Sequence, residues 1–272
     1  MTAVMSAGAG DMIHHGMRWA PIEGVRDTVV RAIEALDVDA VRAAYWRQGE
    51  FVHLERFLPP AVIDRFVEEV DRLRPKIHRS HIPRRKKSGS VSYFTLLAEA
   101  PAIVTLYREP ALLEFLSAVT GKKLKLCPAR DPHSCALYVY TEPGDHIAAH
   151  YDTSFYRGAR YTVLLGLINR TRSRLIGQLF RTDPTRRSVD FELSTEPGAL
   201  VVFNGDKLWH AITPLGPGEE RVALTMQYVT DQRMMPWKRF VSDMKDAISY
   251  FGFREVFRRR ASRLDGEGSC CR

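Results

Sequence analysis

Residues 140–152 read YTEPGDHIAAHYD, and this stretch decides the fold class. Pro143 and Gly144 mark a tight turn between two short β-rich runs. The second run ends in His150, Tyr151 and Asp152. Residues two apart in a strand point to the same face, so we expect the imidazole of His150 and the carboxylate of Asp152 to converge, with Tyr151 facing away.

A second stretch, GALVVFNGDKLWH at 198–210, repeats the pattern of a β-rich run, a turn and a histidine, His210. Arg221 then opens the run 222–229. Two histidines and one carboxylate on one face are typical of a non-haem Fe(II) site that leaves positions open for a bidentate 2-oxo acid and O2. We expect Arg221 to hold the far carboxylate of that acid, because the planar guanidinium grips a carboxylate through two hydrogen bonds and stays charged.

Short β-rich runs fill the chain from residue 124 onward, separated by turn residues such as Pro197-Gly198 and Pro217-Gly218. The runs are 136–141, 147–152, 161–168, 178–181, 188–193, 199–203 and 222–229. Their even spacing, without interleaved helices, predicts a sandwich or a jelly-roll barrel.

The preceding half of the chain has helical periodicity. Apolar spacing predicts helix over 24–48, a short strand at 51–54, a helix over 60–74 and helical segments over 96–119 broken at Pro101 and Pro110. Residues 72–87 hold eight positive side chains and no acidic one, and their prolines favour a loop. This loop is either simply solvated, or a lid that meets an anionic substrate group or a membrane surface.

The chain therefore divides into a flexible leader at 1–20, a helical support and lid region at 21–123, a β core at 124–230 and a C-terminal segment at 231–272. In the last segment, apolar residues at helical spacing predict an amphipathic helix followed by a basic tail. The helix either packs on the barrel, pairs with a second copy in a homodimer, or makes peripheral contact with a membrane. Its apolar residues are Phe240, Met244, Ala247, Ile248 and Phe251.

Composition excludes several classes of protein. An apolar fraction of 45% and a charged fraction of 26% exclude wholesale disorder. Four cysteines in 272 residues are too few for a disulfide scaffold, which favours a reducing, cytoplasmic location. No apolar stretch reaches the ~20 residues of a transmembrane helix, and no secretory signal is evident. The net charge of +8 permits a nucleic acid or an anionic partner without selecting one.

Residues 136–230 resemble the double-stranded β-helix core of the Fe(II)/2-oxoglutarate-dependent dioxygenases. The resemblance rests on a Tyr-x-x-x-Gly-x-x-x-x-x-His-x-Asp pattern over 140–152 and a Gly-x-Leu-x-x-Phe…His-x-x-x-Pro…Arg pattern over 198–221. It implies a mainly β fold with flanking helices around a jelly-roll, cupin-like core. Within the family, 143–152 and 161–166 are most similar to the radical halogenases of free amino acids and their related hydroxylases.

The resemblance also implies residue roles. His150, Asp152 and His210 would be the catalytic iron ligands, and Arg221 the anchor of 2-oxoglutarate. Thr162 occupies a position where the family often places a hydroxyl against the same carboxylate. Two departures leave the second contact to this cosubstrate open: Ala223 stands where many members have serine, and Gly166 where some have tyrosine.

The implied activity is that of an Fe(II)-, 2-oxoglutarate- and O2-dependent hydroxylase that acts on a C–H bond of a small molecule and releases succinate and CO2. Asp152 favours hydroxylation, because the related halogenases lack this carboxylate and bind halide in its place. Candidate substrates are amino acids or natural-product intermediates, with Tyr138, Tyr140 and His146 as candidate contacts. The alternatives are a dioxygenase that modifies nucleic acids or nucleobases, for which the sequence carries no strong signal, and a lipid hydroxylase at a membrane surface.

Overall fold

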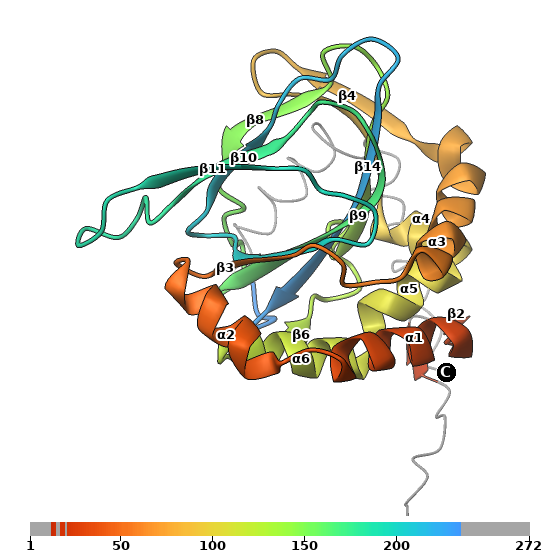
Figure 1. The fold of residues 1–272 in the computed structure, drawn as a ribbon. Helices are drawn as coiled ribbons and strands as arrows, with labels where there is room; N and C mark the ends of the chain where they lie inside the picture. The colour runs from red at the N-terminus through yellow and green to blue at the C-terminus, as the bar shows by residue number, and fades with distance from the viewer. Residues whose placement is uncertain (1–11, 15–16, 20, 235–272) are drawn as a thin grey trace, which may run out of the picture.

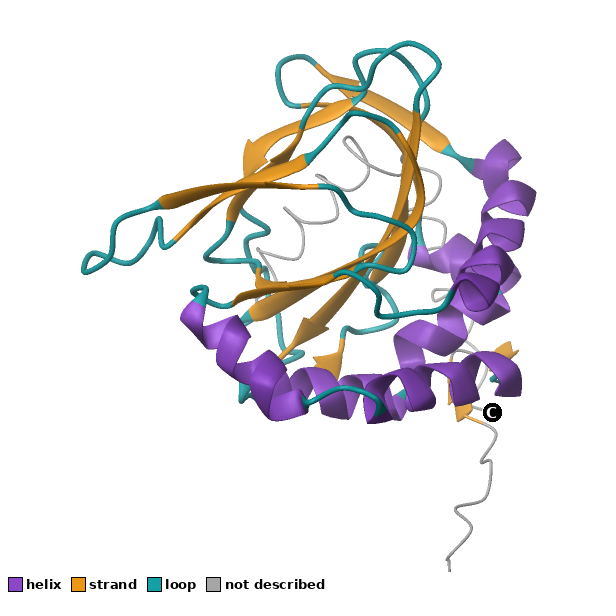
Figure 2. Cartoon of the chain, in the orientation of Figure 1, coloured by secondary structure: helices purple, strands orange, loops and turns teal. Residues whose placement is uncertain are grey.

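The computed structural model describes residues 12–14, 17–19 and 21–234, which form a curled antiparallel sheet with helices packed along one side (Figures 1 and 2). The helices are α1 (Glu23–Glu34), α2 (Val38–Arg47), α3 (Pro60–Leu73), the short 3-10 helix η1 (Arg74–Lys76), α4 (Tyr93–Glu99), α5 (Pro101–Arg108) and α6 (Pro110–Thr120). The strands before residue 124 are β1 (Met12–His14), β2 (Met17–Trp19), β3 (Phe51–Leu54), β4 (His78–Ile82) and β5 (Lys86–Val91). The later strands are β6 (Lys125–Leu126), β7 (Cys135–Tyr140), β8 (His146–His150), β9 (Arg160–Arg170), β10 (Leu175–Leu179), β11 (Val189–Leu193), β12 (Leu200–Asn204), β13 (Trp209–Ile212) and β14 (Glu220–Val229).

The main sheet has the strand order β11-β10-β13-β8-β5-β7-β14-β9-β12-β3, with β4 added to β5 and β6 added to β14. Its curvature brings β8 and β10 opposite β9 and β14 (Figure 1). This confirms the predicted class, a mainly β protein with flanking helices and a jelly-roll core. Strands β3, β4 and β5 come from the part of the chain predicted to be a helical support, so the sheet extends beyond the predicted core at 124–230.

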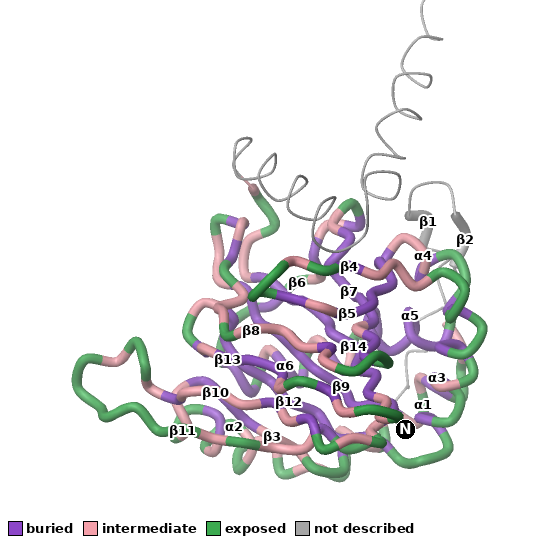
Figure 3. Tube along the Cα trace, turned by 90° about the horizontal axis from the view of Figure 1, so that it is seen from above, coloured by how far each residue is buried: buried purple, intermediate pink, exposed green. Residues whose placement is uncertain are grey.

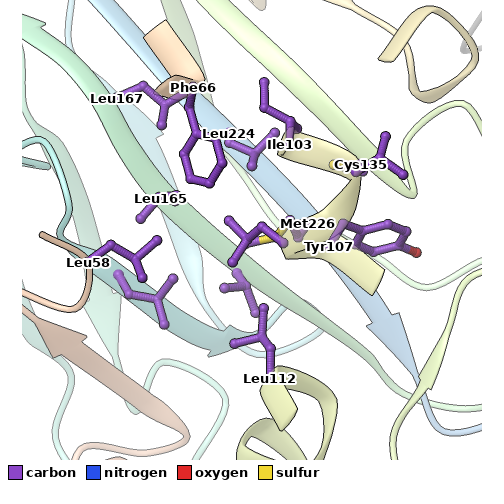
Figure 4. Packing of buried hydrophobic residues seen from close by; sticks show 14 of the residues in the cluster. Leu58, Phe66, Ile103, Tyr107, Leu112, Cys135, Leu165, Leu167, Leu224 and Met226 are labelled. Atoms are coloured by element: carbon purple, nitrogen blue, oxygen red, sulfur yellow. The ribbon is translucent and has the colours of Figure 1, made fainter. Parts of the chain in front are cut away.

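Strict alternation along β14 separates the two faces of the sheet. Val222, Leu224, Met226 and Tyr228 point outward and belong to the core shared with the helices. Figure 4 shows Leu224 and Met226 beside the labelled helix residues, and Figure 3 colours β14 as buried along most of its length. The residues between them point into the curl of the sheet, where they line a cavity: Arg221, Ala223, Thr225 and Gln227.

The helical predictions are confirmed in outline. The expected helix over 60–74 is α3, whose first residue is Pro60. The region 24–48 forms two helices instead of one, because the carboxylate of Asp37 accepts a hydrogen bond from the Ala40 amide at 2.9 Å and starts α2. The region 96–119 contains α4, α5 and α6, with Pro101 and Pro110 each at the start of a helix.

The prediction of a basic loop at 72–87 is wrong. The segment contains the end of α3, η1, strand β4 and the start of β5, and β5 pairs with both β7 and β8. Five of its eight positive side chains lie within ion-pair distance of carboxylates. These five are Arg72, Arg74, Lys76, Arg79 and Lys87. Glu69, the partner of Arg72, lies just before the segment, and the other four side chains have partners in later parts of the chain, so the charge pattern of the segment did not reveal them.

The structure describes only part of each end of the chain. The predicted flexible leader contains a short hairpin in which Met12 pairs with Trp19. The predicted C-terminal helix and basic tail lie outside the described residues. Within the described residues, no helix combines the length and the apolar character needed to cross a membrane.

Candidate functional site

Two neighbouring strands bring the two histidines together. His150 ends β8 and lies directly opposite His210 on β13 in the antiparallel register. Their ring centroids are 4.5 Å apart. One ligand atom from each of His150, Asp152 and His210 lies within 4.8 Å of the others, which makes this group suited to a metal ion.

Asp152 reaches this group by a different route from the predicted one. Strand β8 ends at His150, so Asp152 lies in the following loop and strand alternation does not set its direction. The hydroxyl of Thr162, on β9, instead donates a hydrogen bond to Asp152 Oδ2 at 2.7 Å. Gly205 allows the close approach, since a Cβ there would lie 2.8 Å from the Asp152 carbonyl oxygen.

Backbone carbonyls set the protonation of both imidazoles. Nδ1 of His150 lies 2.9 Å from the Ala148 oxygen, and Nδ1 of His210 lies 3.1 Å from the Leu208 oxygen. A carbonyl oxygen only accepts, so each Nδ1 is the donor, and in the neutral ring Nε2 keeps its lone pair. Nε2 of His150 is 3.3 Å from Asp152 Oδ1, and two electron-rich atoms this close favour a cation beside them. The donor set therefore fits a divalent metal such as Fe(II).

The pKa shifts also favour a neutral His210 and an ionised Asp152. Burial lowers the pKa of His210 to about 4, so this ring is neutral at pH 7 and able to donate its lone pair. Burial alone would raise the pKa of Asp152, but the neighbouring imidazoles of His150 and His210 hold it well below its usual range. The site thus combines neutral imidazole and carboxylate, the forms that bind metal.

Arg221 occupies the same cavity and has an unused hydrogen-bonding atom. It is 2% exposed, and its Nη2 donates to Thr195 Oγ1 at 2.9 Å. Its Nη1 is buried and has no hydrogen-bond partner among the described residues. The guanidinium also lies 5.6 Å from the centre of the Tyr140 ring. A buried cation with a free donor in a cavity beside the triad fits the carboxylate of a 2-oxo acid.

Gly166, the second departure from the family pattern, has a structural reason. A Cβ at this position would lie 2.2 Å from the Glu196 carbonyl oxygen and 2.6 Å from that of Thr195. The backbone that carries Thr195 therefore crosses β9 where a larger residue would stand. Thr195 supplies a contact to Arg221 that no motif in the sequence signals.

Gly166→Ala is expected to lower the free energy of unfolding by about 1–3 kcal/mol, because the new methyl group meets rigid backbone. It should also weaken 2-oxoglutarate binding by displacing Thr195 from Arg221. Chemical unfolding and a cosubstrate titration measure the two effects. Gly24→Ala is the control, since nothing lies within 4 Å of a Cβ there, and a loss of similar size in both variants would contradict the argument.

The remaining predicted residues fall into two groups. Tyr138 and Tyr140 line the cavity that contains the triad, and Thr162 contacts Asp152. His146 is not among the described residues that line this cavity, and its Nδ1 lies 2.8 Å from the Gly144 oxygen. We therefore do not retain His146 as a substrate contact.

The turn that precedes β8 is held by a buried ion pair. Asp145 is fully buried and accepts hydrogen bonds from Arg79 Nη1 at 2.8 Å and Nη2 at 2.7 Å. Its Oδ2 also accepts from the amides of Thr141 and Glu142. Burial alone would raise the pKa of Asp145, but these hydrogen bonds outweigh burial and lower it. Arg79, in the segment predicted to be a lid, thus fixes the turn that leads to His150.

Arg79→Met is expected to lower the free energy of unfolding at pH 7 by about 2–4 kcal/mol, because it leaves the buried carboxylate of Asp145 with only Lys87, 4.0 Å away, as a cation. The lowered pKa of Asp145 means that the pair stabilises the fold above the ordinary carboxyl pKa of about 4, and that this contribution is lost as the pH falls through the lower folded value. Urea unfolding across this pH range measures the effect.

Arg65→Met is the matched control, because Arg65 pairs with Glu68 on the surface. It should change stability by no more than about 0.5 kcal/mol. Equal losses in the two variants, or a loss in Arg79→Met that persists unchanged at low pH, would contradict this role of the Asp145 pair.

No known family model and no curated protein matches the sequence. The structure is similar to several solved structures. The non-haem α-ketoglutarate-dependent epimerase SnoN from nogalamycin biosynthesis matches with a TM-score of 0.58 and 14% identity, covering 70% of this chain and 81% of SnoN. The carbocyclase SnoK from the same biosynthesis matches with a TM-score of 0.57 and 15% identity, covering 72% of this chain and 85% of SnoK.

A prolyl hydroxylase from Trichoplax adhaerens, solved with a hypoxia inducible factor peptide fragment, matches with a TM-score of 0.58 and 15% identity. The match covers 78% of this chain and 94% of that protein. This chain therefore has the fold shared by these proteins, which confirms the fold that the motifs predicted.

Proposed function

We propose that this chain is an Fe(II)- and 2-oxoglutarate-dependent oxygenase that hydroxylates a C–H bond of a small molecule. The observation that supports this most is the convergence of two imidazoles and one carboxylate in a cavity that also holds the buried Arg221. Either feature alone has ordinary structural explanations. Their presence in one cavity matches the separate needs of the metal and of the 2-oxo acid.

His150, Asp152 and His210 would hold Fe(II). With 2-oxoglutarate and O2, the metal would supply the oxidising chemistry, with succinate and CO2 as by-products. Thr162 orients Asp152 through the hydrogen bond to Oδ2. This role differs from the predicted one, in which Thr162 contacts the cosubstrate directly.

Arg221 would bind the far carboxylate of 2-oxoglutarate. The hydroxyl of Thr195 holds Nη2, and Nη1 remains available for the carboxylate. Tyr140 lies against the same guanidinium, so we assign it to the cosubstrate end of the cavity instead of the substrate. Tyr138 remains the candidate substrate contact among the predicted residues.

Hydroxylation is the proposed outcome because Asp152 is present. The similar structures carry different reactions in their names, an epimerase, a carbocyclase and a prolyl hydroxylase, so the fold does not decide between outcomes. A halide would need a ligand position on the metal, and Asp152 would fill one of the positions that the protein supplies.

The test is product analysis with the Fe(II)-loaded protein, 2-oxoglutarate, chloride and mixtures of free amino acids, peptides, lipids and nucleosides. We expect succinate together with a product one oxygen atom heavier than its substrate, and no chlorinated product even at high chloride. A chlorinated product would show that Asp152 does not bind the metal. If no succinate forms with any of these mixtures, the proposed enzyme class is wrong.

The distribution of charge does not favour a nucleic-acid substrate. Most of the basic side chains at 72–87 are paired with carboxylates, so they do not form a free positive surface. A nucleic-acid-modifying enzyme needs such a surface to follow the phosphates. We therefore propose a small-molecule substrate.

A further inference from the structure

A second buried guanidinium lines the cavity, and the proposed function does not use it. Arg160 opens β9 and is 8% exposed. Its Nε donates to Gln227 Oε1 at 2.9 Å, and its carbonyl oxygen accepts from the Gly205 amide at 2.9 Å. The side chain is thus held through Nε and the backbone through its carbonyl oxygen, and neither hydrogen bond uses the two terminal nitrogens of the guanidinium.

Those terminal nitrogens form no hydrogen bond with any residue that the structure describes, and no described carboxylate lies within ion-pair distance of them. The two carboxylates that interact electrostatically with Arg160, Asp131 and Asp152, have other partners. Asp131 accepts from the His133 amide at Oδ1 and from the Tyr156 hydroxyl at Oδ2. Asp152 accepts from Thr162 and belongs to the metal group.

A buried guanidinium without a direct partner is costly unless a ligand completes it. Asp152 and Asp131 are near enough to raise the pKa of Arg160 even though burial alone would lower it, so the group stays charged. Arg160 therefore carries a positive charge and two terminal nitrogens without hydrogen-bond partners among the described residues in the wall of the cavity.

Arg160 and Arg221 lie at different ends of that wall. Arg221 faces Asn169 in the β9–β14 register, whereas Arg160 faces Val229, eight residues further along β14. Eight residues of extended strand span about 26 Å of backbone. One guanidinium suffices for the far carboxylate of 2-oxoglutarate, so the cosubstrate at Arg221 leaves Arg160 unexplained.

We propose that Arg160 binds a carboxylate group of the substrate, which makes the substrate a carboxylic acid. This inference rests on the proposed function, because it treats the cavity as the place where substrate meets Fe(II) and 2-oxoglutarate. The planar fork of two terminal nitrogens matches a carboxylate. A phosphate dianion fits less well, because Asp131 and Asp152 place two negative charges beside the same guanidinium.

The test uses small carboxylates as probes and does not require the natural substrate. The protein is loaded with Fe(II) and saturating 2-oxoglutarate without oxygen, so that the Arg221 end is filled. Acetate, propionate and benzoate are then added in parallel with acetamide, propionamide and benzamide, and with inorganic phosphate. Saturation-transfer NMR reports which of the acids and amides bind, and loss of the acid signal on adding phosphate reports whether phosphate displaces them.

We expect the acids to bind at least tenfold more tightly than their amides or phosphate. Arg160→Gln should abolish this preference, and Arg160→Lys should keep part of it, because lysine retains the charge and loses the fork. Arg157→Gln is the matched control, since Arg157 is exposed in the loop that leads into β9, and it should behave as the unchanged protein does.

Three results would overturn the inference: no preference for acids in the unchanged protein, equal binding in Arg160→Gln and the Arg157 control, or phosphate binding more tightly than the acids. The 2-oxoglutarate signal in the same samples separates this failure from a failure of the proposed function. If 2-oxoglutarate does not bind, the proposed function fails. If 2-oxoglutarate binds and Arg160→Gln does not change the binding of the acids, only the assignment of Arg160 to a substrate carboxylate fails.

Discussion

Replacing His210 by alanine is expected to weaken Fe(II) binding at least 100-fold while the sheet remains folded. His210 offers one of three protein ligand atoms, and loss even of a residue that only orients a ligand typically costs 10–100-fold in metal affinity. The side chain makes a single hydrogen bond, to the Leu208 oxygen. The metal-free variant should therefore lose no more than about 2 kcal/mol of unfolding free energy. An anaerobic Fe(II) titration and urea unfolding measure the two quantities.

His146→Ala is a closely matched control. His146, His150 and His210 all place Nδ1 against the carbonyl oxygen two residues earlier, but His146 is not among the described residues that line the cavity. It should keep the Fe(II) affinity of the unchanged protein. The metal assignment is wrong if His210→Ala binds Fe(II) normally, or if His146→Ala loses as much.

The second large effect concerns Arg221. Arg221→Lys keeps the positive charge but loses the planar fork, and Arg221→Gln loses both. We expect the dissociation constant of 2-oxoglutarate to rise about 10- to 150-fold for lysine, equivalent to a charged hydrogen bond of ~1.5–3 kcal/mol, and further for glutamine. Fe(II) affinity should change little, because Arg221 is not one of the grouped metal-ligand residues.

Arg170→Lys is the control for this series. Arg170 lies on β9, one residue from the position opposite Arg221, and its side chain is 78% exposed. Isothermal titration with 2-oxoglutarate on the Fe(II)-loaded proteins compares them. An unchanged affinity in Arg221→Gln would move the anchor to another residue, with Arg160 the first to examine.

The sequence was sufficient to predict that His150 and His210 lie together, because each histidine belongs to a local motif. Turn residues and β-rich runs around His150 and His210 predicted the strands, and the two histidines then meet through the antiparallel pairing of β8 and β13. Core positions on β14 also follow from alternation, which separates Leu224 and Met226 from Arg221. These features depend on residues close together in the chain or on a simple period.

The features that the sequence did not predict depend on distant partners. Strands β4 and β5 contain many charges. Strand β4 pairs with β5, β5 pairs with β7 and β8, and Arg79 on β4 forms an ion pair with Asp145. Asp152 is oriented by Thr162, and Arg221 by Thr195 from a loop without a motif. No local pattern reports such contacts.

Arg160 is an intermediate case. It stands two residues before Thr162 on the same strand, so alternation places both side chains on the face that carries the cavity. That signal was present in the sequence. Only the structure shows that the guanidinium of Arg160 is buried and that Gln227 contacts its Nε alone.

We infer that the three ligand residues and Arg221 form one site for Fe(II) and 2-oxoglutarate together. Anaerobic titration of 2-oxoglutarate into the protein, with and without Fe(II), measures this coupling. We expect one equivalent to bind with Fe(II) present and at least tenfold weaker binding without it, because the 2-oxo acid then loses the metal and keeps only the Arg221 contact. Binding of equal strength in both conditions, or none in either, would contradict the account.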